Sequence, residues 1–135
     1  MVKENIIQAT GKRKTSIARV SLKKGSGIIY VNNEILSSYV GNELLVLKVK
    51  EPLLISGLDG KYDIKIKISG GGQSSQADSM RQAIAKALVE ITGDDNLKKT
   101  FVDYDRSLIV ADTRFKEMKK PNNSHARAKR QKSYR

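Results

Sequence analysis

The sequence contains no cysteine and only one histidine among its 135 residues. The lack of cysteine excludes disulfide bridges, thiolate metal sites and cysteine nucleophiles. His125 has few acidic neighbours, so we expect it to serve as a hydrogen-bonding group, and we expect no metal or other cofactor. No stretch approaches the roughly 18 apolar residues of a transmembrane helix, and the first residues lack the apolar run of a signal peptide. These absences predict a soluble, cytoplasmic protein with no membrane partner.

Acidic residues are also scarce: 14 Asp and Glu stand against 26 Lys and Arg, for a formal net charge of +12. The imbalance is local, because residues 113–135 hold nine of the cations and one acid, Glu117. A concentrated positive charge favours an anionic partner over a general role in solubility. A solvated, disordered tail is the alternative, and a membrane surface is disfavoured because the segment lacks the large apolar side chains of an interfacial helix.

The C-terminal segment differs from the rest of the chain in its apolar pattern as well. Beyond Met118 it has no large aliphatic side chain, and it shows no apolar repeat of 2.0 or 3.6 residues. Such a segment cannot bury enough surface to offset the entropy lost on ordering, so we expect it to order against a partner. The sequence therefore predicts a globular domain over residues 1–112 and an extended basic arm over residues 113–135.

Within residues 1–112 the clearest signal is the strict alternation of residues 62–69, which predicts a strand. An apolar stripe at steps of three and four residues predicts a helix over about 73–91, with a capping box of Ser75 and Asp78 at its start. Together the patterns predict an α+β fold, with one sheet of about four strands packed against helices. The other expected strands are 6–10, ended by Gly11, then 17–22 and 28–31 as a hairpin, and a short one at 108–110; the other expected helices are 34–40, 43–50, stopped by Pro52, and 95–104.

Two loops carry residue types suited to phosphate. Lys12, Arg13 and Lys14 follow the first predicted strand; they do not form a P-loop, and they are candidates for RNA phosphate contacts. The stretch 70–75, Gly-Gly-Gly-Gln-Ser-Ser, joins a strand to a helix and is either an anion site or a tight turn for close packing. It resembles the phosphate loop of kinases of the galactokinase and homoserine kinase type, which keeps a small-molecule kinase as an alternative.

No catalytic group accompanies that loop. Asp103, Asp105 and Asp112 are interpreted as helix caps or as partners of Arg106 and Arg114, because no base or nucleophile stands near them in the sequence. A free-standing RNA-binding module remains a further alternative.

Several motifs in one order resemble a known family. Residues 10–20 (TGKRKTSIARV), residues 70–77 (GGGQSSQA) with Arg81 and Ala85, residues 112–114 (DTR) and residues 128–135 (AKRQKSYR) are similar to the signatures of the ninth small-subunit ribosomal protein. The ending resembles the archaeal and eukaryotic branch, and the resemblance covers about residues 6–135. Asn122 and Asn123 depart from it, since many relatives have glycine there.

The resemblance implies a fold like the second domain of another small-subunit ribosomal protein, with a left-handed βαβ crossover. It implies a structural protein in the head of the small subunit, not an enzyme, with no small-molecule substrate. The expected partners are small-subunit rRNA, neighbouring head proteins and the anticodon stem-loop of the peptidyl-site tRNA, which the end of the arm would reach.

Carried onto this sequence, the resemblance and the charge pattern give two sets of site residues. The expected rRNA-binding residues are Lys12, Arg13, Lys14, Arg19, Arg114, Lys119, Lys120, Arg127, Lys129 and Arg130, with Lys65 and Lys67 as further candidates. The expected tRNA-contacting residues are Lys132, Ser133, Tyr134 and Arg135.

Overall fold

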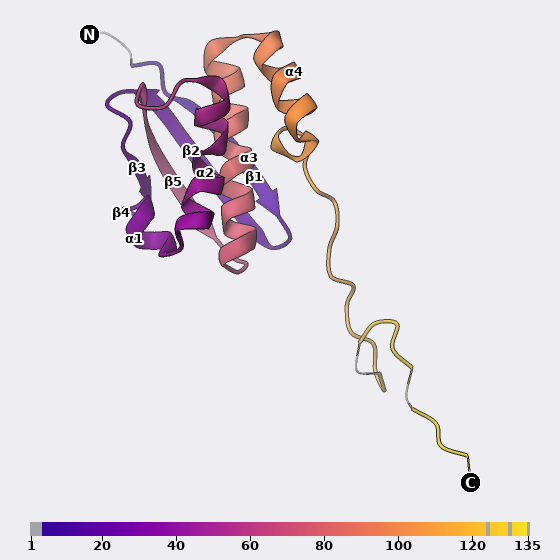
Figure 1. The fold of residues 1–135 in the computed structure, drawn as a ribbon. Helices are drawn as coiled ribbons and strands as arrows, with labels where there is room; N and C mark the ends of the chain where they lie inside the picture. The colour runs from indigo at the N-terminus through magenta and orange to yellow at the C-terminus, as the bar shows by residue number, and fades with distance from the viewer. Residues whose placement is uncertain (1–3, 124, 130, 135) are drawn as a thin grey trace.

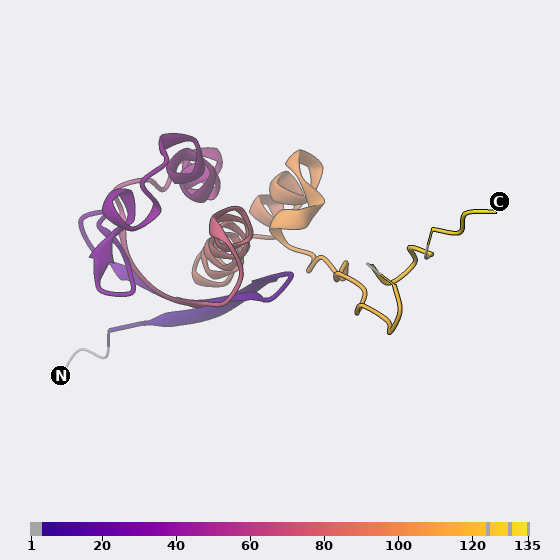
Figure 2. The same ribbon diagram turned by 90° about the horizontal axis from the view of Figure 1, so that it is seen from below.

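The fold is a single mixed β-sheet with helices packed on one of its faces (Figure 1). It is seen in a computed structural model that describes residues 4–123, 125–129 and 131–134. Figure 2 shows that the helices lie on one side of the sheet, and that no described element covers the other side. The predicted α+β class is confirmed, with five strands in place of about four.

The strands are β1 (Ile7–Arg13), β2 (Ser16–Lys24), β3 (Ile29–Val31), β4 (Glu34–Ile35) and β5 (Tyr62–Ser69), and their order in the sheet is β1-β2-β5-β3-β4. β2 pairs antiparallel with both β1 and β5, whereas β3 pairs parallel with β5. The predicted hairpin of the second and third strands is therefore wrong, because β5 lies between them. Asp63 of β5 fixes this arrangement: its carboxylate accepts hydrogen bonds from the backbone of Ser26, Gly27 and Ile28, in the loop between β2 and β3.

The connection from β3 to β5 has the rare hand. In Figure 1 both strands run downward, β5 lies to the right of β3, and the helices that connect them lie in front of the sheet. This makes the crossover left-handed, against the strong general preference for the right hand. The expectation from the family resemblance is thus confirmed.

The helices are α1 (Leu36–Val40), α2 (Glu43–Ser56), α3 (Gln73–Thr92) and α4 (Asp95–Tyr104), followed by a 3₁₀ turn, η1 (Arg106–Leu108). α3 is central: the predicted stripe is buried against the sheet, and α2 and α4 flank the helix on its other sides (Figure 2). The start of α3 differs from the predicted capping box, since the Ser75 hydroxyl bonds the backbone of Gly72. No helix in the described part of the chain is long and apolar enough to cross a bilayer.

α2 runs six residues beyond its predicted end. Pro52 lies inside the helix and is buried, although proline removes one helical hydrogen bond. Burial of Val49 and Leu53 against the core and a left-handed Gly57 cap, whose N–H reaches the last carbonyls, offset that loss.

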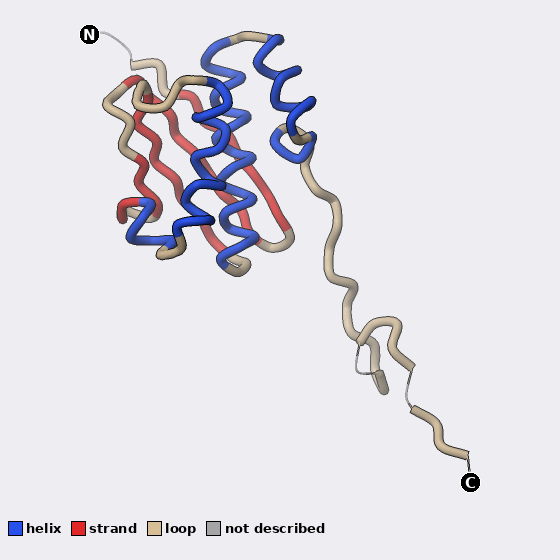
Figure 3. The backbone as a smooth tube through the Cα atoms, viewed as in Figure 1, coloured by secondary structure: helices blue, strands red, loops and turns tan. Residues whose placement is uncertain are grey.

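β1 and η1 also depart from the prediction. β1 continues through Gly11 instead of ending there, and residues 106–108 form a 3₁₀ turn where a strand was expected at 108–110. The backbone of α3 passes close to β1 at Gly11, a common reason for glycine within a strand. After Leu108 the described chain has no helix or strand, as Figure 3 shows for the long C-terminal loop.

Candidate nucleic-acid interface

The turn between β1 and β2 holds the first basic cluster. Lys12 and Lys14 are exposed, and Lys14 adopts a left-handed backbone with φ of 52° at the turn. The turn lies against the glycines that precede α3, so that a Cβ on Gly70 would stand 2.5 Å from the carbonyl oxygen of Thr15. The fold therefore brings the two loops singled out in the sequence into contact.

The glycine turn is built for this close packing. Gly70 and Gly71 have φ of 75° and 70°, in the region that favours glycine, and both press against the β1–β2 turn. The Ser75 hydroxyl is engaged by Gly72, and the Asp78 carboxylate lines the adjoining hollow. The close approach of the glycines to the β1–β2 turn accounts for their presence, so the geometry favours the tight-turn interpretation over the kinase one.

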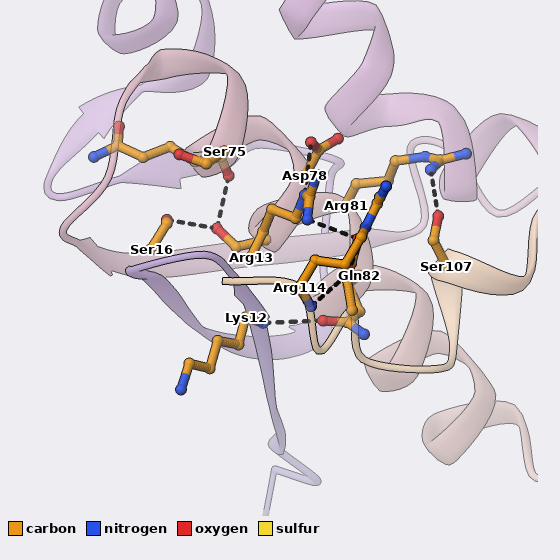
Figure 4. Close-up of polar contacts among 12 residues, drawn as sticks. Lys12, Arg13, Ser16, Ser75, Asp78, Arg81, Gln82, Ser107 and Arg114 are labelled. Carbon is orange, nitrogen blue, oxygen red and sulfur yellow. Dashed lines mark hydrogen bonds and ion pairs between the residues drawn. The ribbon is translucent and has the colours of Figure 1, made fainter. Parts of the chain in front are cut away.

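Arg13 connects β1 to the start of the arm. Its guanidinium lies 2.7 Å from the Asp112 carboxylate and 3.8 Å from that of Asp78 (Figure 4). Asp112 also binds Arg114 at 2.7 Å, and the Lys12 ammonium lies 4.9 Å from the centre of the Phe115 ring. Arg13 and Arg114, two of the expected rRNA-binding residues, are thus paired with a carboxylate in the protein itself.

A buried arginine in α3 links the helices next to this region through ion pairs. Arg81 of α3 is only 7% exposed, and it lies 2.6 Å from Glu51 of α2 and 2.9 Å from Asp105 at the end of α4. Partial burial raises the pKa of Asp105, but hydrogen bonds from Ser107 and the charge of Arg81 outweigh it and hold that pKa below its usual value. An arginine within the apolar stripe of α3 is a visible signal in the sequence, but its partners are far away in the chain. Asp105 also caps the 3₁₀ turn η1, since its carboxylate accepts a hydrogen bond from the backbone N–H of Ser107, as one of the two interpretations of the sequence predicted.

Acid is expected to weaken the structure at the base of the arm. Hydrogen bonds from the side chain and backbone of Arg114, and the charge of Arg13, hold the pKa of Asp112 far below its usual value. A carboxylate with a depressed pKa stabilises the folded state above its unfolded pKa, and this stability is lost as the pH falls through the folded value. Urea unfolding should therefore show the free energy falling from about pH 5 towards pH 2, with a shallower slope in Asp112→Asn. Parallel curves for the two proteins would contradict this role of Asp112.

The uncovered face of the sheet carries a second group of cations. Arg19 of β2 stands opposite Lys67 of β5, and Lys65 stands between Ser21 of β2 and Tyr30 of β3. Arg19, Lys65 and Lys67 are exposed, and among the described residues none of the three lies within 4.0 Å of a carboxylate. They differ in this respect from Arg13 and Arg114.

The arm extends away from the body, as Figures 1 and 2 show. Phe115, Met118 and Tyr134 are 56%, 84% and 89% exposed, so the described arm has no core of its own. Glu117 binds Lys120 at 3.6 Å and Arg127 at 2.8 Å, whereas the other lysines of the described arm lie near no carboxylate: Lys116, Lys119, Lys129 and Lys132. Arg130 and Arg135, also among the expected site residues, lie outside the described residues.

Known proteins match this chain over both the body and the arm. The family model described as "Ribosomal protein S9/S16" matches residues 11–135. Small ribosomal subunit protein uS9 of Thermoplasma acidophilum is 48% identical over 127 residues, which cover 93% of this chain and 98% of that protein. The protein of the same name from Thermoplasma volcanium is 46% identical over 127 residues, with 93% and 96% covered. The chain therefore belongs to the uS9 family of ribosomal proteins, which are structural, non-enzymatic components of the small subunit.

Proposed function

We propose that this protein binds rRNA in the head of the small subunit and that its arm reaches the peptidyl-site tRNA. The observation that carries the proposal is the arm itself, which extends away from the body (Figure 1). In its described part the side chains of the arm are mostly exposed, and several of its lysines have no carboxylate partner. We propose the same division of labour as the charge pattern predicts, with residues 1–112 as the anchoring domain and residues 113–135 as the reaching arm.

The physical chemistry of the arm suits a channel in folded RNA. Lysines spaced by small and polar residues give separated positive charges, each able to replace the counterions of one phosphate. An extended backbone is narrow, and it orders only when RNA supplies the contacts that the chain lacks. The arm residues proposed to line the rRNA path are Arg114, Lys119, Lys120, Arg127, Lys129 and Arg130.

On the body, Lys12, Lys14 and Arg19 are proposed to bind rRNA phosphates. Lys14 stands at the tip of the β1–β2 turn, where no carboxylate lies within 4.0 Å of it among the described residues. Arg13 contributes mainly by fixing the base of the arm through Asp112, to which Arg114 also binds, and this sets the direction in which the arm leaves the body. Neighbouring head proteins would complete the surroundings of the domain.

The end of the arm is proposed to contact the anticodon stem-loop of the peptidyl-site tRNA. Lys132, Ser133 and Tyr134 are exposed and lie farthest from the body in Figure 1, and Arg135 completes the set. Ammonium, hydroxyl and phenol groups suit phosphate, ribose and base surfaces common to all tRNAs. Such contacts stabilise any elongator tRNA without selecting among them.

Deletion of residues 132–135 is the experiment that tests this proposal. Small subunits containing the shortened protein should form in normal yield, because the anchoring domain and most of the arm remain. Their affinity for tRNA in the peptidyl site should fall by about tenfold or more, since even one lost hydrogen bond to a charged group contributes about 1.5–3 kcal/mol in favourable cases. Filter binding of labelled tRNA to purified subunits measures this affinity.

Two results would contradict the proposal. One is a block in assembly with unchanged tRNA affinity in the residual particles, which would make the last residues an assembly element. The other is found by sedimentation of cell extract: a native protein that stays in the light fractions while subunits are intact would be a free-standing RNA-binding module.

A further inference from the structure

The bare face of the sheet carries a group of cations without a partner in the chain. Among the described residues, Arg19, Lys65 and Lys67 have no carboxylate within 4.0 Å. By contrast, Arg13, Lys48 and Arg81 of the body each lie within 4.0 Å of one. Arg19, Lys65 and Lys67 stand on the neighbouring strands β2 and β5, whose outer face no described element covers (Figure 2).

This arrangement costs folding stability. Arg19 and Lys67 are direct cross-strand partners, and like charges in that position repel. The carboxylate that the strands present on this face, that of Asp63, is occupied by the backbone N–H groups of Ser26, Gly27 and Ile28. The exposed pair is therefore open to an anion from outside the chain, whose binding would relieve the repulsion.

Beside these cations lies a surface suited to a base. Tyr30 is the cross-strand neighbour of Lys65 and is 37% exposed. Together with Asn33, Lys65 and Lys67 it lines a shallow hollow of about 570 Å³. Asn32 also lines the hollow, and two hydrogen bonds between its side chain and the backbone of Ile68 hold it in place.

We propose that the bare face of the sheet binds an unpaired segment of rRNA, with a base stacked on Tyr30 and the flanking phosphates held by Arg19, Lys65 and Lys67. An aromatic ring beside lysines on an exposed sheet is the combination that single-stranded RNA uses, because every unpaired base has a face to stack and a phosphate on each side. A duplex hides those faces. The inference rests on the proposed rRNA-binding function and adds a second contact surface, separate from the arm, with its own class of RNA.

The test compares RNA binding by the full-length protein and three variants, using a labelled oligouridylate and an RNA duplex of equal length. Tyr30→Ala should weaken oligouridylate binding by about fivefold to a hundredfold and leave duplex binding unchanged, and Tyr30→Phe should retain wild-type affinity. Lys65→Gln with Lys67→Gln should lower the salt dependence of single-strand binding by about 1.4 in slope. Thermal unfolding of each variant checks that the fold is intact.

Ultraviolet cross-linking of native small subunits locates the contact independently. A peptide containing Tyr30 should carry a cross-linked nucleotide from a single-stranded position. A cross-link from this peptide to an RNA helix or to a neighbouring protein would overturn the inference, and so would unchanged oligouridylate affinity in folded Tyr30→Ala.

Replacement of Lys116, Lys119 and Lys129 with glutamine separates the two proposals. If that variant lost RNA binding while Tyr30→Ala bound RNA like the wild type, the proposed function of the arm would be supported and the proposed RNA site on the sheet would be contradicted. If the wild-type protein did not bind RNA at all, both proposals would be contradicted.

Discussion

Replacement of Lys116, Lys119 and Lys129 with glutamine is expected to lower the affinity for head rRNA on the order of 10²-fold at physiological salt, because counterion release at three phosphates no longer occurs. In the described chain these three side chains are exposed and lie near no carboxylate, so their charge is free to act on RNA. The salt dependence of binding should decrease by about three in slope, one for each phosphate that the variant no longer neutralises. Filter binding to an rRNA fragment over a range of salt concentrations gives both values.

A matched control removes the same charge from the body. Lys86, Lys98 and Lys99 lie on the helices α3 and α4, and their replacement with glutamine keeps the net charge equal to that of the arm variant. The control should bind with nearly wild-type affinity and salt slope. Equal reductions in both variants would show that overall charge, and not the arm, determines binding.

Gly11→Ala is expected to reduce the free energy of unfolding by about 3 kcal/mol or more, which corresponds to a fall in Tm on the order of 10 °C. A Cβ at this position would stand 2.1 Å from the carbonyl oxygen of Ser79 and 2.7 Å from the backbone nitrogen of Ala83. Both atoms belong to the backbone of α3, so no side-chain rotation relieves the clash. The neighbouring N–H of Lys12 donates to Gln82 at 2.9 Å, and this hydrogen bond would shift as well. Urea unfolding followed by circular dichroism measures the change.

Gly72→Ala serves as the comparison for that substitution. Gly72 has φ of −103°, and a Cβ there meets nothing within 4 Å. Its replacement should cost no more than about 1 kcal/mol, the usual difference between glycine and alanine at the start of a helix. If Gly11→Ala were as mild as Gly72→Ala, the close approach of α3 to β1 would not contribute to stability.

Disruption of the packing at Gly11 should also disturb the contacts that hold the base of the arm. The residues that hold the base of the arm stand next to Gly11 on β1, since Arg13 binds Asp112 and Lys12 lies over Phe115. The strand that α3 fixes in place is thus also the strand that holds the base of the arm. Stability of the body and the direction of the arm are coupled through β1.

Local sequence patterns were sufficient to predict the strand and the helix that each bury one face. The alternation of residues 62–69 and the stripe of residues 73–91 record which side chains meet the core, and β5 and α3 fall where these patterns predict. The basic arm could be predicted equally well, because a segment with few large apolar side chains cannot form a core. Family membership followed from motifs in order, and the sequence comparisons confirm it.

Local patterns failed where a distant partner decides the outcome. Pro52 reads as a helix stop, yet burial of its neighbours against the core keeps α2 intact to Ser56. The loop between β2 and β3 reads as a hairpin turn, yet hydrogen bonds to Asp63 lead β3 to the far side of β5.

The sequence by itself determined that this is an α+β ribosomal protein of the uS9 family with a basic C-terminal arm. Only the tertiary structure decided which cations are free. Arg13 and Arg19 look alike in the sequence, six residues apart in one basic motif. Arg13 meets Asp112, 99 residues away in the chain, whereas Arg19 faces the bare side of the sheet beside Lys67. The physical reason is that the effect of a charge depends on which groups surround it in space, and folding brings those groups together from positions far apart in the chain.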